Sequence, residues 1–336
     1  MPDTLKSDTL KSKVRTAGRN GVAAGLRLVP EPLFTSLRTS FPATAATSWQ
    51  HKAMRGVLEA VRHRGIPEST NTFQVADNPD LSFVRADSFV TERLYWFGER
   101  YGYEPGGIYW WRYFCRRSQR VLELGANIGY YTVQGARVAP TTSYTAVEPH
   151  PGCAGTCRRN VEANNLSNVD VVEAAAVSTS ASGQVTLRLP GGKDHYTEAP
   201  STGFVGRNEV HRSDADDPSY REVIVPAVEL RSLITGVDLF KLDVEGQEYD
   251  LLSSITEELI SLRPTIFLEL LDDTPMLRAL VASLCDRAEY HCFVPTPDRL
   301  VPLSLAGVSS LDVRARLDTR DIVLTCLDVP SGPPGA

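Results

Sequence analysis

The chain carries a glycine turn and an acidic residue at a spacing that suits a nucleoside ligand. Gly125 and Gly129 follow the apolar run Val121–Leu124, where a buried strand would turn into a helix. Glycine adopts backbone angles closed to other residues, and open α/β sheets bind ligands in the crevice beyond their strand ends. Glu148 follows the next apolar run, roughly 20 residues further on. A carboxylate there can accept hydrogen bonds from both hydroxyls of a ribose, so we expect a nucleoside-bearing ligand.

The composition of the turn distinguishes between nucleoside ligands. Dinucleotide folds use Gly-x-Gly-x-x-Gly, whose three glycines admit a pyrophosphate, whereas this turn has two glycines and is preceded by Glu123. A carboxylate would repel a pyrophosphate but could orient the amino group of S-adenosylmethionine, whose sulfonium is positively charged. The residues expected to bind this cofactor are Glu123, Gly125, Ala126, Asn127, Gly129, Glu148 and Pro149.

Both acidic residues also have a purely structural interpretation. Glu123 could bond to the backbone of its own loop. Glu148 stands just before Pro149 and Pro151, where a helix would begin and its dipole would favour negative charge. The spacing from the glycine turn favours the ribose role for Glu148.

A second set of polar residues could act on an acceptor. Asp243 ends the predicted strand Asp238–Leu242 and would lie at the crevice, so it is the first candidate for a catalytic base or an acceptor-orienting group. His195 and His211 lie in a polar insertion and could act as general bases near neutral pH, although solvated loop histidines are commoner. Glu245 stands near the start of the next predicted helix, where capping explains an acidic residue.

Metal binding is a secondary hypothesis. Glu269 and the pair Asp272–Asp273 follow another predicted strand, and with Asp243 they could hold Mg²⁺ through oxygen ligands. No fixed ligand spacing supports this site, so solvated loop carboxylates are favoured and no metal ligand is assigned. Cys153 and Cys157 could share a helix face, but no further ligands stand at a zinc-like spacing, and helix packing is favoured.

The elements that must position these residues alternate between strand and helix from residue 120 onward. This order predicts parallel strands with crossover helices on both faces, a doubly wound α/β sheet of about seven strands. The expected strands are Val121–Leu124, Ser143–Val147, Val169–Val172, Asp238–Leu242, Thr265–Leu270, Tyr290–Val294 and Ile322–Leu327, with extended segments at Gly183–Leu189 and Glu222–Val228. The expected helices are Ile128–Val138, Pro151–Asn164, Gly246–Ile260 and Pro275–Ala288.

Around this sheet we expect three further regions. Residues 1–50 are basic and repetitive and predict a loosely ordered extension, and residues 329–336 predict a flexible tail. Residues 51–118 predict a helical, aromatic-rich region in which the apolar side chains pack rather than line a pocket. The α/β domain would then span 119–328, with an insertion at 190–221.

Composition limits the partners. The formal net charge of −6 is spread over interspersed charges, so we expect no nucleic-acid partner. We find no apolar stretch near the roughly 20 residues that cross a bilayer and no signal sequence, so we expect no integral membrane contact and a cytoplasmic location. The six cysteines fit reduced thiols, and homo-oligomerisation is left open.

Four ordered motifs resemble those of the FkbM family of methyltransferases. They are Glu123–Thr132, Ala146–Pro151 followed by Asn160 and Asn164, Lys241–Glu248, and Thr265–Glu269, with agreement over about residues 95–295 that includes Tyr103–Pro105. The family often has Asp where Glu123 stands, and either carboxylate could perform the role. The N-terminal region and the insertion lie outside the resemblance and are expected to select the acceptor.

The resemblance implies a class I methyltransferase (Rossmann-like) fold and S-adenosylmethionine as the donor. It also implies O-methylation of a hydroxylated small molecule: a natural product, sugar or glycan. Two alternatives remain, an inactive nucleoside-binding module and a nicotinamide-dependent oxidoreductase. The missing third glycine disfavours the oxidoreductase.

Overall fold

The computed structural model describes residues 31–41, 49–62, 65–179, 183–190, 199, 203–205, 220–313, 320–330 and 332. The chain divides into two compact units, one formed by Met1–Arg85 with Thr91–Tyr103 and the other by Ala86–Val90 with Glu104–Ala336. Among the described residues, we find no helix with the length and apolar character needed to cross a bilayer.

The first unit combines helices with a short hairpin. Its elements are α2 (Glu31–Ser40), α3 (Trp49–Val61), the antiparallel strands β1 (Thr72–Val75) and β2 (Asn78–Val84), and most of α4 (Phe89–Gly102). The buried guanidinium of Arg38 joins three of them, because it donates to the carbonyl oxygens of Gln74 and Tyr95. Most of helix α3 lies in the region expected to be helical, and Trp49 at its first position is 74% exposed.

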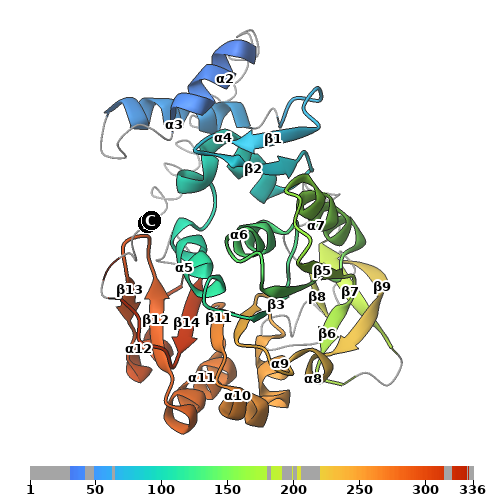
Figure 1. Cartoon of the computed structure of the whole chain (residues 1–336), viewed down its shortest axis with the longest axis vertical. Coiled ribbons are helices and arrows are strands. Elements are labelled where there is room, and N and C mark those ends of the chain that lie inside the picture. Colours follow the sequence, from blue (N-terminus) through green and yellow to red (C-terminus); the bar gives the residue numbers. More distant parts are fainter. Residues whose placement is uncertain are drawn as a thin grey trace, which may run out of the picture. The chain divides into compact units, whose positions relative to one another are not determined.

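The second unit is built on an eight-stranded sheet (Figure 1). Its order is β13-β12-β14-β11-β10-β3-β4-β5, and the strands span Arg120–Leu124 (β3), Ser143–Val147 (β4), Val169–Val172 (β5), Leu239–Leu242 (β10), Thr265–Glu269 (β11), His291–Pro295 (β12), Leu300–Pro302 (β13) and Asp321–Thr325 (β14). Strands β3, β4, β5, β10 and β11 pair in parallel, whereas β14 runs antiparallel to both of its neighbours. The seven expected strands are present, and β13 adds an eighth at the edge.

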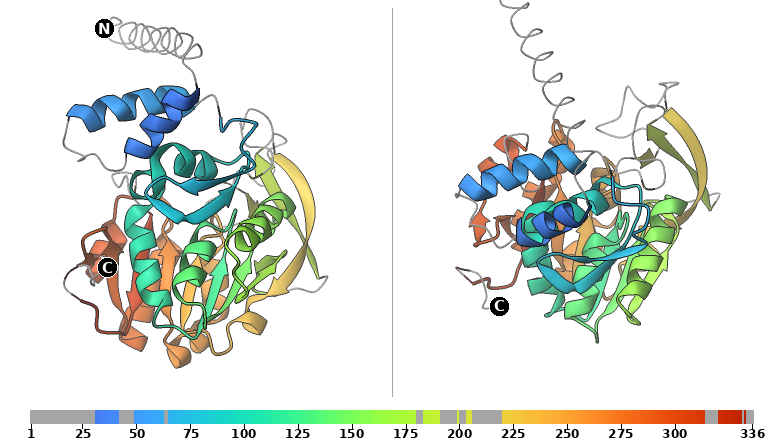
Figure 2. Two further views of the ribbon diagram at one scale, coloured as in Figure 1. Left: turned by 45° about the horizontal axis from the view of Figure 1, so that its top comes forward. Right: turned by 90° about the horizontal axis from the view of Figure 1, so that it is seen from above.

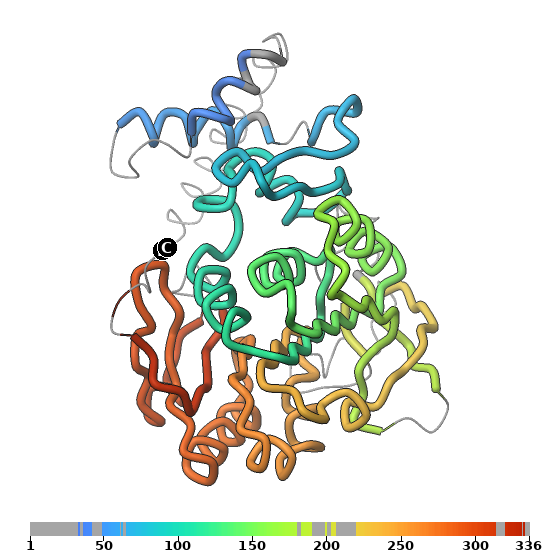
Figure 3. Tube along the Cα trace, viewed as in Figure 1, coloured from blue at the N-terminus to red at the C-terminus, as the bar shows by residue number. Residues whose placement is uncertain are grey.

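The path of the chain creates a switch point in the middle of this sheet. The chain moves outward from β3 to β5 and then returns to β10, which pairs with β3 on its other side (Figure 3). The carboxyl ends of β3 and β10 therefore lie next to each other, and a doubly wound sheet binds its ligands at such a point.

Helices cover both faces of the sheet, as expected for a doubly wound fold (Figure 2). One face carries α5 (Pro105–Cys115), α6 (Tyr130–Val138) and α7 (Pro151–Ala163), and the other carries α8 (Leu230–Leu233), α9 (Glu248–Ser254), α10 (Thr256–Leu262), α11 (Pro275–Ala288) and α12 (Leu305–Ser310). The sheet has the class I methyltransferase arrangement that the resemblance implies.

The prediction of a single helix over Gly246–Ile260 is wrong in two respects. It begins only at Glu248, because Glu245 and Gly246 have positive φ angles of 53° and 103°. It is then interrupted at Ile255, whose φ of −123° and ψ of 22° separate α9 from α10.

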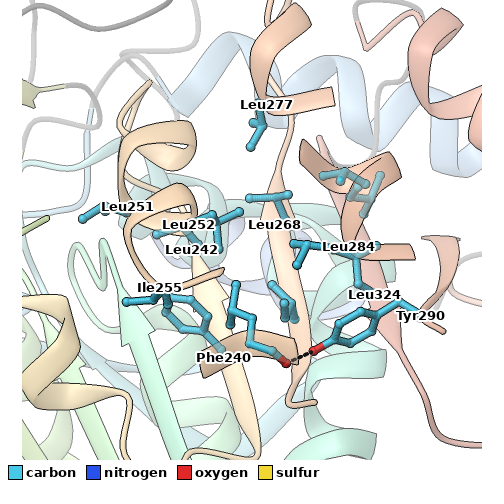
Figure 4. Close-up of a cluster of buried hydrophobic side chains, with 14 of the residues drawn as sticks. Phe240, Leu242, Leu251, Leu252, Ile255, Leu268, Leu277, Leu284, Tyr290 and Leu324 are labelled. Atoms are coloured by element: carbon cyan, nitrogen blue, oxygen red, sulfur yellow. Dashed lines mark hydrogen bonds between the residues drawn. The ribbon is translucent and has the colours of Figure 1, made fainter. Parts of the chain in front are cut away.

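A large cluster of buried hydrophobic side chains forms the core on the α8–α12 face (Figure 4). Phe240 and Leu242 of β10 and Leu268 of β11 are fully buried against Leu252 and Leu284 from the helices. Strands buried on both faces are normally apolar at every position. Lys241 breaks that rule on β10, because it is only 1% exposed.

A smaller four-stranded sheet completes this unit. It has the order β6-β9-β7-β8, formed by Ala175–Val177, Tyr220–Glu229, Gln184–Pro190 and Phe204–Val205. The antiparallel pairing of β7 with β9 confirms the two extended segments expected on either side of the insertion.

Candidate active site

The glycine turn after β3 lies directly against the end of β10. Asp243 N donates to the carbonyl oxygen of Leu124 at 3.2 Å. Gly125 has a φ of 80°, and a Cβ built on it would lie 1.7 Å from the carbonyl oxygen of Asp243. Gly129 has a φ of 81°, and a Cβ built on it would lie 2.6 Å from Cys157 Sγ. Both glycines are therefore required by their backbone angles and by a close neighbour.

Glu148 joins the first turn to the start of α7. Its Oε2 accepts a hydrogen bond from Asn127 N and its Oε1 accepts one from His150 N, each at 2.8 Å. The residue is 6% exposed, and burial raises the pKa of its carboxyl group to about 7 in spite of these two donors. A carboxylate oxygen has two lone pairs, so both oxygens keep the capacity to accept from a further hydroxyl.

Glu123 has partners that neither sequence interpretation anticipated. Its Oε2 accepts hydrogen bonds from the hydroxyls of Thr132, at 2.7 Å, and Tyr144. The side chain is 1% exposed, and burial raises the pKa of its carboxyl group to about 7. In this structure Glu123 therefore connects β3 to α6 and β4 through side chains rather than through the loop backbone.

The rest of the turn is held by amide groups. Asn127 adopts the left-handed region with a φ of 49°, which asparagine tolerates well, and its Oδ1 accepts from Ile128 N at 2.7 Å. Asn160 of α7 donates from Nδ2 to the carbonyl oxygen of Ile128 at 2.7 Å. Ala126 is buried beside them, and Pro149 is half-buried. The motif residue Asn160 thus supports the turn from the neighbouring helix.

A buried lysine holds Asp243 at the end of β10. Lys241 Nζ lies 2.7 Å from Asp243 Oδ2 and 4.5 Å from the centre of the Tyr131 ring. Burial alone would lower the pKa of Lys241, but the carboxylates of Asp243, Asp321 and Glu104 raise it above its usual value. Asp243 itself keeps 27% of its side chain exposed, so its carboxylate reaches the surface of the site.

The tyrosine hydroxyl beside Lys241 lies between two further carboxylates. Tyr131 Oη lies 2.8 Å from Glu104 Oε2 and 3.1 Å from Asp321 Oδ2. Burial, followed by the neighbouring Asp321, raises the pKa of Glu104 to about 8. Sequence reasoning assigned no role to these residues. Lys241 opens a motif and Glu104 lies in the approach to β3, whereas Asp321 had no sequence signal.

Three carboxylates meet at the ends of β10 and β11. Asp243, Glu245 and Glu269 each offer one oxygen, and these oxygens all lie within 4.8 Å of one another. Glu269 is 7% exposed, and its Oε2 has no hydrogen-bond partner among the described residues. In the described part of the chain, this group does not include Asp272 or Asp273, so Glu245 takes the place that the sequence hypothesis gave to them.

Glu245 and Glu248 play different parts in the turn before α9. Glu248 is 1% exposed, and its Oε1 accepts from Val244 N at 2.9 Å, so it stabilises the turn before α9. Glu245 lies in that turn, and burial, followed by Asp243, raises the pKa of its carboxyl group to about 8. His195 and His211 lie outside the described residues, so they stay predictions.

The family model described as the methyltransferase FkbM domain matches residues 123–290, which is half of the chain. The chain belongs to the FkbM methyltransferase family. It is therefore an S-adenosylmethionine-dependent methyltransferase, and this assignment excludes the oxidoreductase alternative. The matched region of this FkbM methyltransferase begins at Glu123 and contains Glu148, Asp243 and Glu269, whereas Glu104 and Asp321 lie outside it.

Two fungal proteins are similar in sequence to this FkbM methyltransferase. Methyltransferase 1 from Beauveria bassiana (strain ARSEF 2860) is 28% identical over 190 residues, which cover 54% of this chain and 76% of that protein. Methyltransferase sdnD from Sordaria araneosa is 26% identical over 157 residues, which cover 41% of this chain and 61% of sdnD.

Two solved structures share lower similarity. The methyltransferase FkbM from Methylobacillus flagellatus KT is 16% identical with a TM-score of 0.34, covering 62% of this chain and 43% of that one. The O-methyltransferase TomG from Streptomyces achromogenes is 13% identical with a TM-score of 0.34, covering 65% of this chain and 78% of that one. At such TM-scores neither structure bears on the fold or the site.

Proposed function

We propose that this FkbM methyltransferase transfers a methyl group to a hydroxyl of a small molecule, in the class of natural products, sugars and glycans. The cofactor would lie along the turn Gly125–Gly129, with Glu148 accepting hydrogen bonds from its ribose hydroxyls. The acceptor would lie beyond it, over Asp243. His195 stays a candidate base from the insertion.

The residues around the turn fit S-adenosylmethionine. Among the described residues, each oxygen of Glu148 accepts one backbone N–H, so the carboxylate can receive two further donors of the kind that a ribose presents. At the neighbouring strand ends, the carboxyl groups of Asp243, Glu245 and Glu269 stand beside Lys241 and Arg320. When bound, this cofactor supplies an activated methyl group.

The chain's own contribution is orientation and acceptance of a proton. Lys241 fixes Asp243 through its 2.7 Å ion pair, and the exposed part of the Asp243 carboxylate can accept a hydrogen bond from an acceptor hydroxyl. Holding that oxygen in line lowers the entropic part of the barrier. Transfer of the hydroxyl proton to a carboxylate as the new bond forms would add about 10²- to 10⁴-fold in rate.

The observation that carries this proposal is the contact between the glycine turn and Asp243. The Cβ-sized gap at Gly125 is filled by the Asp243 carbonyl, so the expected cofactor turn and the expected acceptor residue are immediate neighbours. A donor bound along the turn would therefore have the Asp243 carboxylate close to its reacting end.

Calorimetric measurement of S-adenosylhomocysteine binding to Glu148→Gln tests the part of the proposal that concerns the cofactor site. The amide keeps the shape but loses the charge, and we expect at least about a tenfold weaker affinity, since a hydrogen bond to a charged group contributes about 1.5–3 kcal/mol. Glu162→Gln is the matched control, because Glu162 is exposed on α7. Unchanged affinity in a folded Glu148→Gln protein would remove Glu148 from the cofactor site.

Transfer of tritiated methyl groups to a panel of small molecules tests the part of the proposal that concerns the acceptor. Sugars, polyols and phenols carry hydroxyls, and amines and thiols of similar size serve as controls. We expect label only on hydroxyl-bearing acceptors. Label on amines or thiols alone would contradict O-methylation while leaving the methyltransferase assignment intact.

A further inference from the structure

The acidic group at the ends of β10 and β11 is drawn from three separate positions. Asp243 follows β10, Glu245 lies two residues further in a turn with a left-handed φ of 53°, and Glu269 is the last residue of β11. One oxygen of each lies within 4.8 Å of the other two. Carboxylates held at this distance repel each other, and either a proton or a cation bound between them relieves that repulsion.

We propose that Asp243, Glu245 and Glu269 form a binding site for a hard divalent cation of the Mg²⁺ or Mn²⁺ class. Carboxylate oxygens are the ligands that such ions prefer. This ligand set differs from the one considered from the sequence, because Glu245 contributes and Asp272 and Asp273 do not.

The spacing of the oxygens is compatible with one shared ion. Two ligands of the same ion can be separated by at most twice the bond length, which is about 4.2 Å for Mg²⁺ and about 5 Å for Ca²⁺. The observed upper bound of 4.8 Å falls between these limits, so small side-chain movements would bring all three oxygens onto Mg²⁺ or Mn²⁺. Water and an acceptor oxygen would complete the six positions that these ions favour.

An independent observation is the unsatisfied oxygen of Glu269. This side chain is 7% exposed, and its Oε2 accepts no hydrogen bond from the described residues. The Arg320 side chain, which is 57% exposed, lies 3.5 Å from the other oxygen, Oε1. Lys241 is committed to Asp243 Oδ2. Buried carboxylate oxygens in native proteins normally have partners, and a metal ion would supply one here.

The place of this site suggests its use. Asp243 is the residue assigned to the acceptor, so an ion bound there would polarise an acceptor hydroxyl and help it to lose its proton. This role rests on the proposed function, whereas binding of the ion does not.

Mn²⁺ binding to the full chain, followed by electron paramagnetic resonance without cofactor or acceptor, tests the site directly. The signal of free Mn²⁺ should fall with a stoichiometry of one ion per chain, and excess Mg²⁺ should restore it. In Glu269→Gln we expect at least tenfold weaker binding. Asp273→Asn is the matched control, because Asp273 is exposed after β11 and asparagine also tolerates its left-handed φ of 57°.

Glu245→Gln provides a second variant in case Glu269→Gln fails to fold, and it should weaken Mn²⁺ binding by a similar factor. Equal binding by wild type, Glu245→Gln and Asp273→Asn would overturn the proposal, as would no binding by wild type at millimolar Mn²⁺. A protein that binds Mn²⁺ at this site but transfers no methyl group to hydroxyls would keep the metal site and lose the proposed function.

Discussion

The two halves of the sheet edge hold their buried carboxylates in different ways. On the β3–β4 half, Glu123 and Glu148 each accept two hydrogen bonds from the chain's own donors. On the β10–β11 half, Asp243 depends on a single lysine, and Glu269 keeps an oxygen that no described residue serves. Burial is similarly deep for Glu148 and Glu269, at 6% and 7% exposure, so burial alone does not explain the contrast.

The contrast separates a preformed region from an incomplete one. Donors on the first half are backbone N–H groups and hydroxyls whose positions follow from the turn, from β4 and from the starts of α6 and α7, so the fold itself holds them in place. The second half has more acceptors than donors, and it can be completed only by something that brings positive charge or protons. We infer that the first half recognises the cofactor by its fixed shape and that the second half takes its final form on binding.

The largest expected loss of stability is on the β10–β11 half, from Lys241→Met. Methionine fills the same volume but leaves Asp243 and its neighbours without their buried cation, and breaking a buried ion pair in this way costs about 3–5 kcal/mol. Urea unfolding at pH 8 measures the loss. Lys52→Met, on the exposed surface of α3, should change stability by less than about 0.5 kcal/mol. A loss below about 1 kcal/mol for Lys241→Met would show that this half does not depend on its lysine.

A smaller loss of stability is expected from Gly125→Ala, where the turn after β3 contacts the end of β10. The new methyl group would have to displace the Asp243 carbonyl, and we expect a loss of about 3 kcal/mol. Gly183→Ala is the matched comparison, because Gly183 has a similar φ of 68° but no atom within 4 Å of the added Cβ. It should lose only about 1 kcal/mol, the cost of a left-handed residue. Equal losses would mean that backbone angle alone explains both glycines.

The smallest expected change in stability concerns Glu123 on the β3–β4 half, and it depends on pH. Burial raises the pKa of Glu123 from 4.5 to about 7 in the folded chain, so its contribution to stability is fully present below pH 4.5 and is lost as the pH rises through 7. Glu123→Gln, which cannot ionise, should therefore gain stability relative to wild type over this window, by on the order of 2 kcal/mol at pH 8. Chemical unfolding between pH 4.5 and 8 measures the difference. A difference that does not change with pH would show that Glu123 ionises at its ordinary pKa.

Much of the fold could be predicted because its signals are local. Strands β3, β4, β5, β10 and β11 follow short apolar runs, and α6, α7 and α11 follow helical spacing, so neighbouring residues specify them. The prediction of a helix beginning at Gly246 was wrong because Glu245 and Gly246 adopt positive φ angles, which helical periodicity does not reveal. Strand β13 was missed because three residues carry too little periodicity to register.

The sequence by itself determined the family, the doubly wound class, the glycine turn and the positions of Glu148 and Asp243 after their strands. The family follows from the resemblance of four ordered motifs, and the other features follow from apolar runs and spacing along the chain. Only the tertiary structure decided which groups share a partner. Tyr131 comes between Glu104 and Asp321, residues 217 positions apart, and Glu245 replaces Asp272 and Asp273 beside Glu269. Burial, unmet hydrogen bonds and raised pKa values depend on such contacts, because desolvation is set by every element that packs around a group and not by its neighbours in sequence.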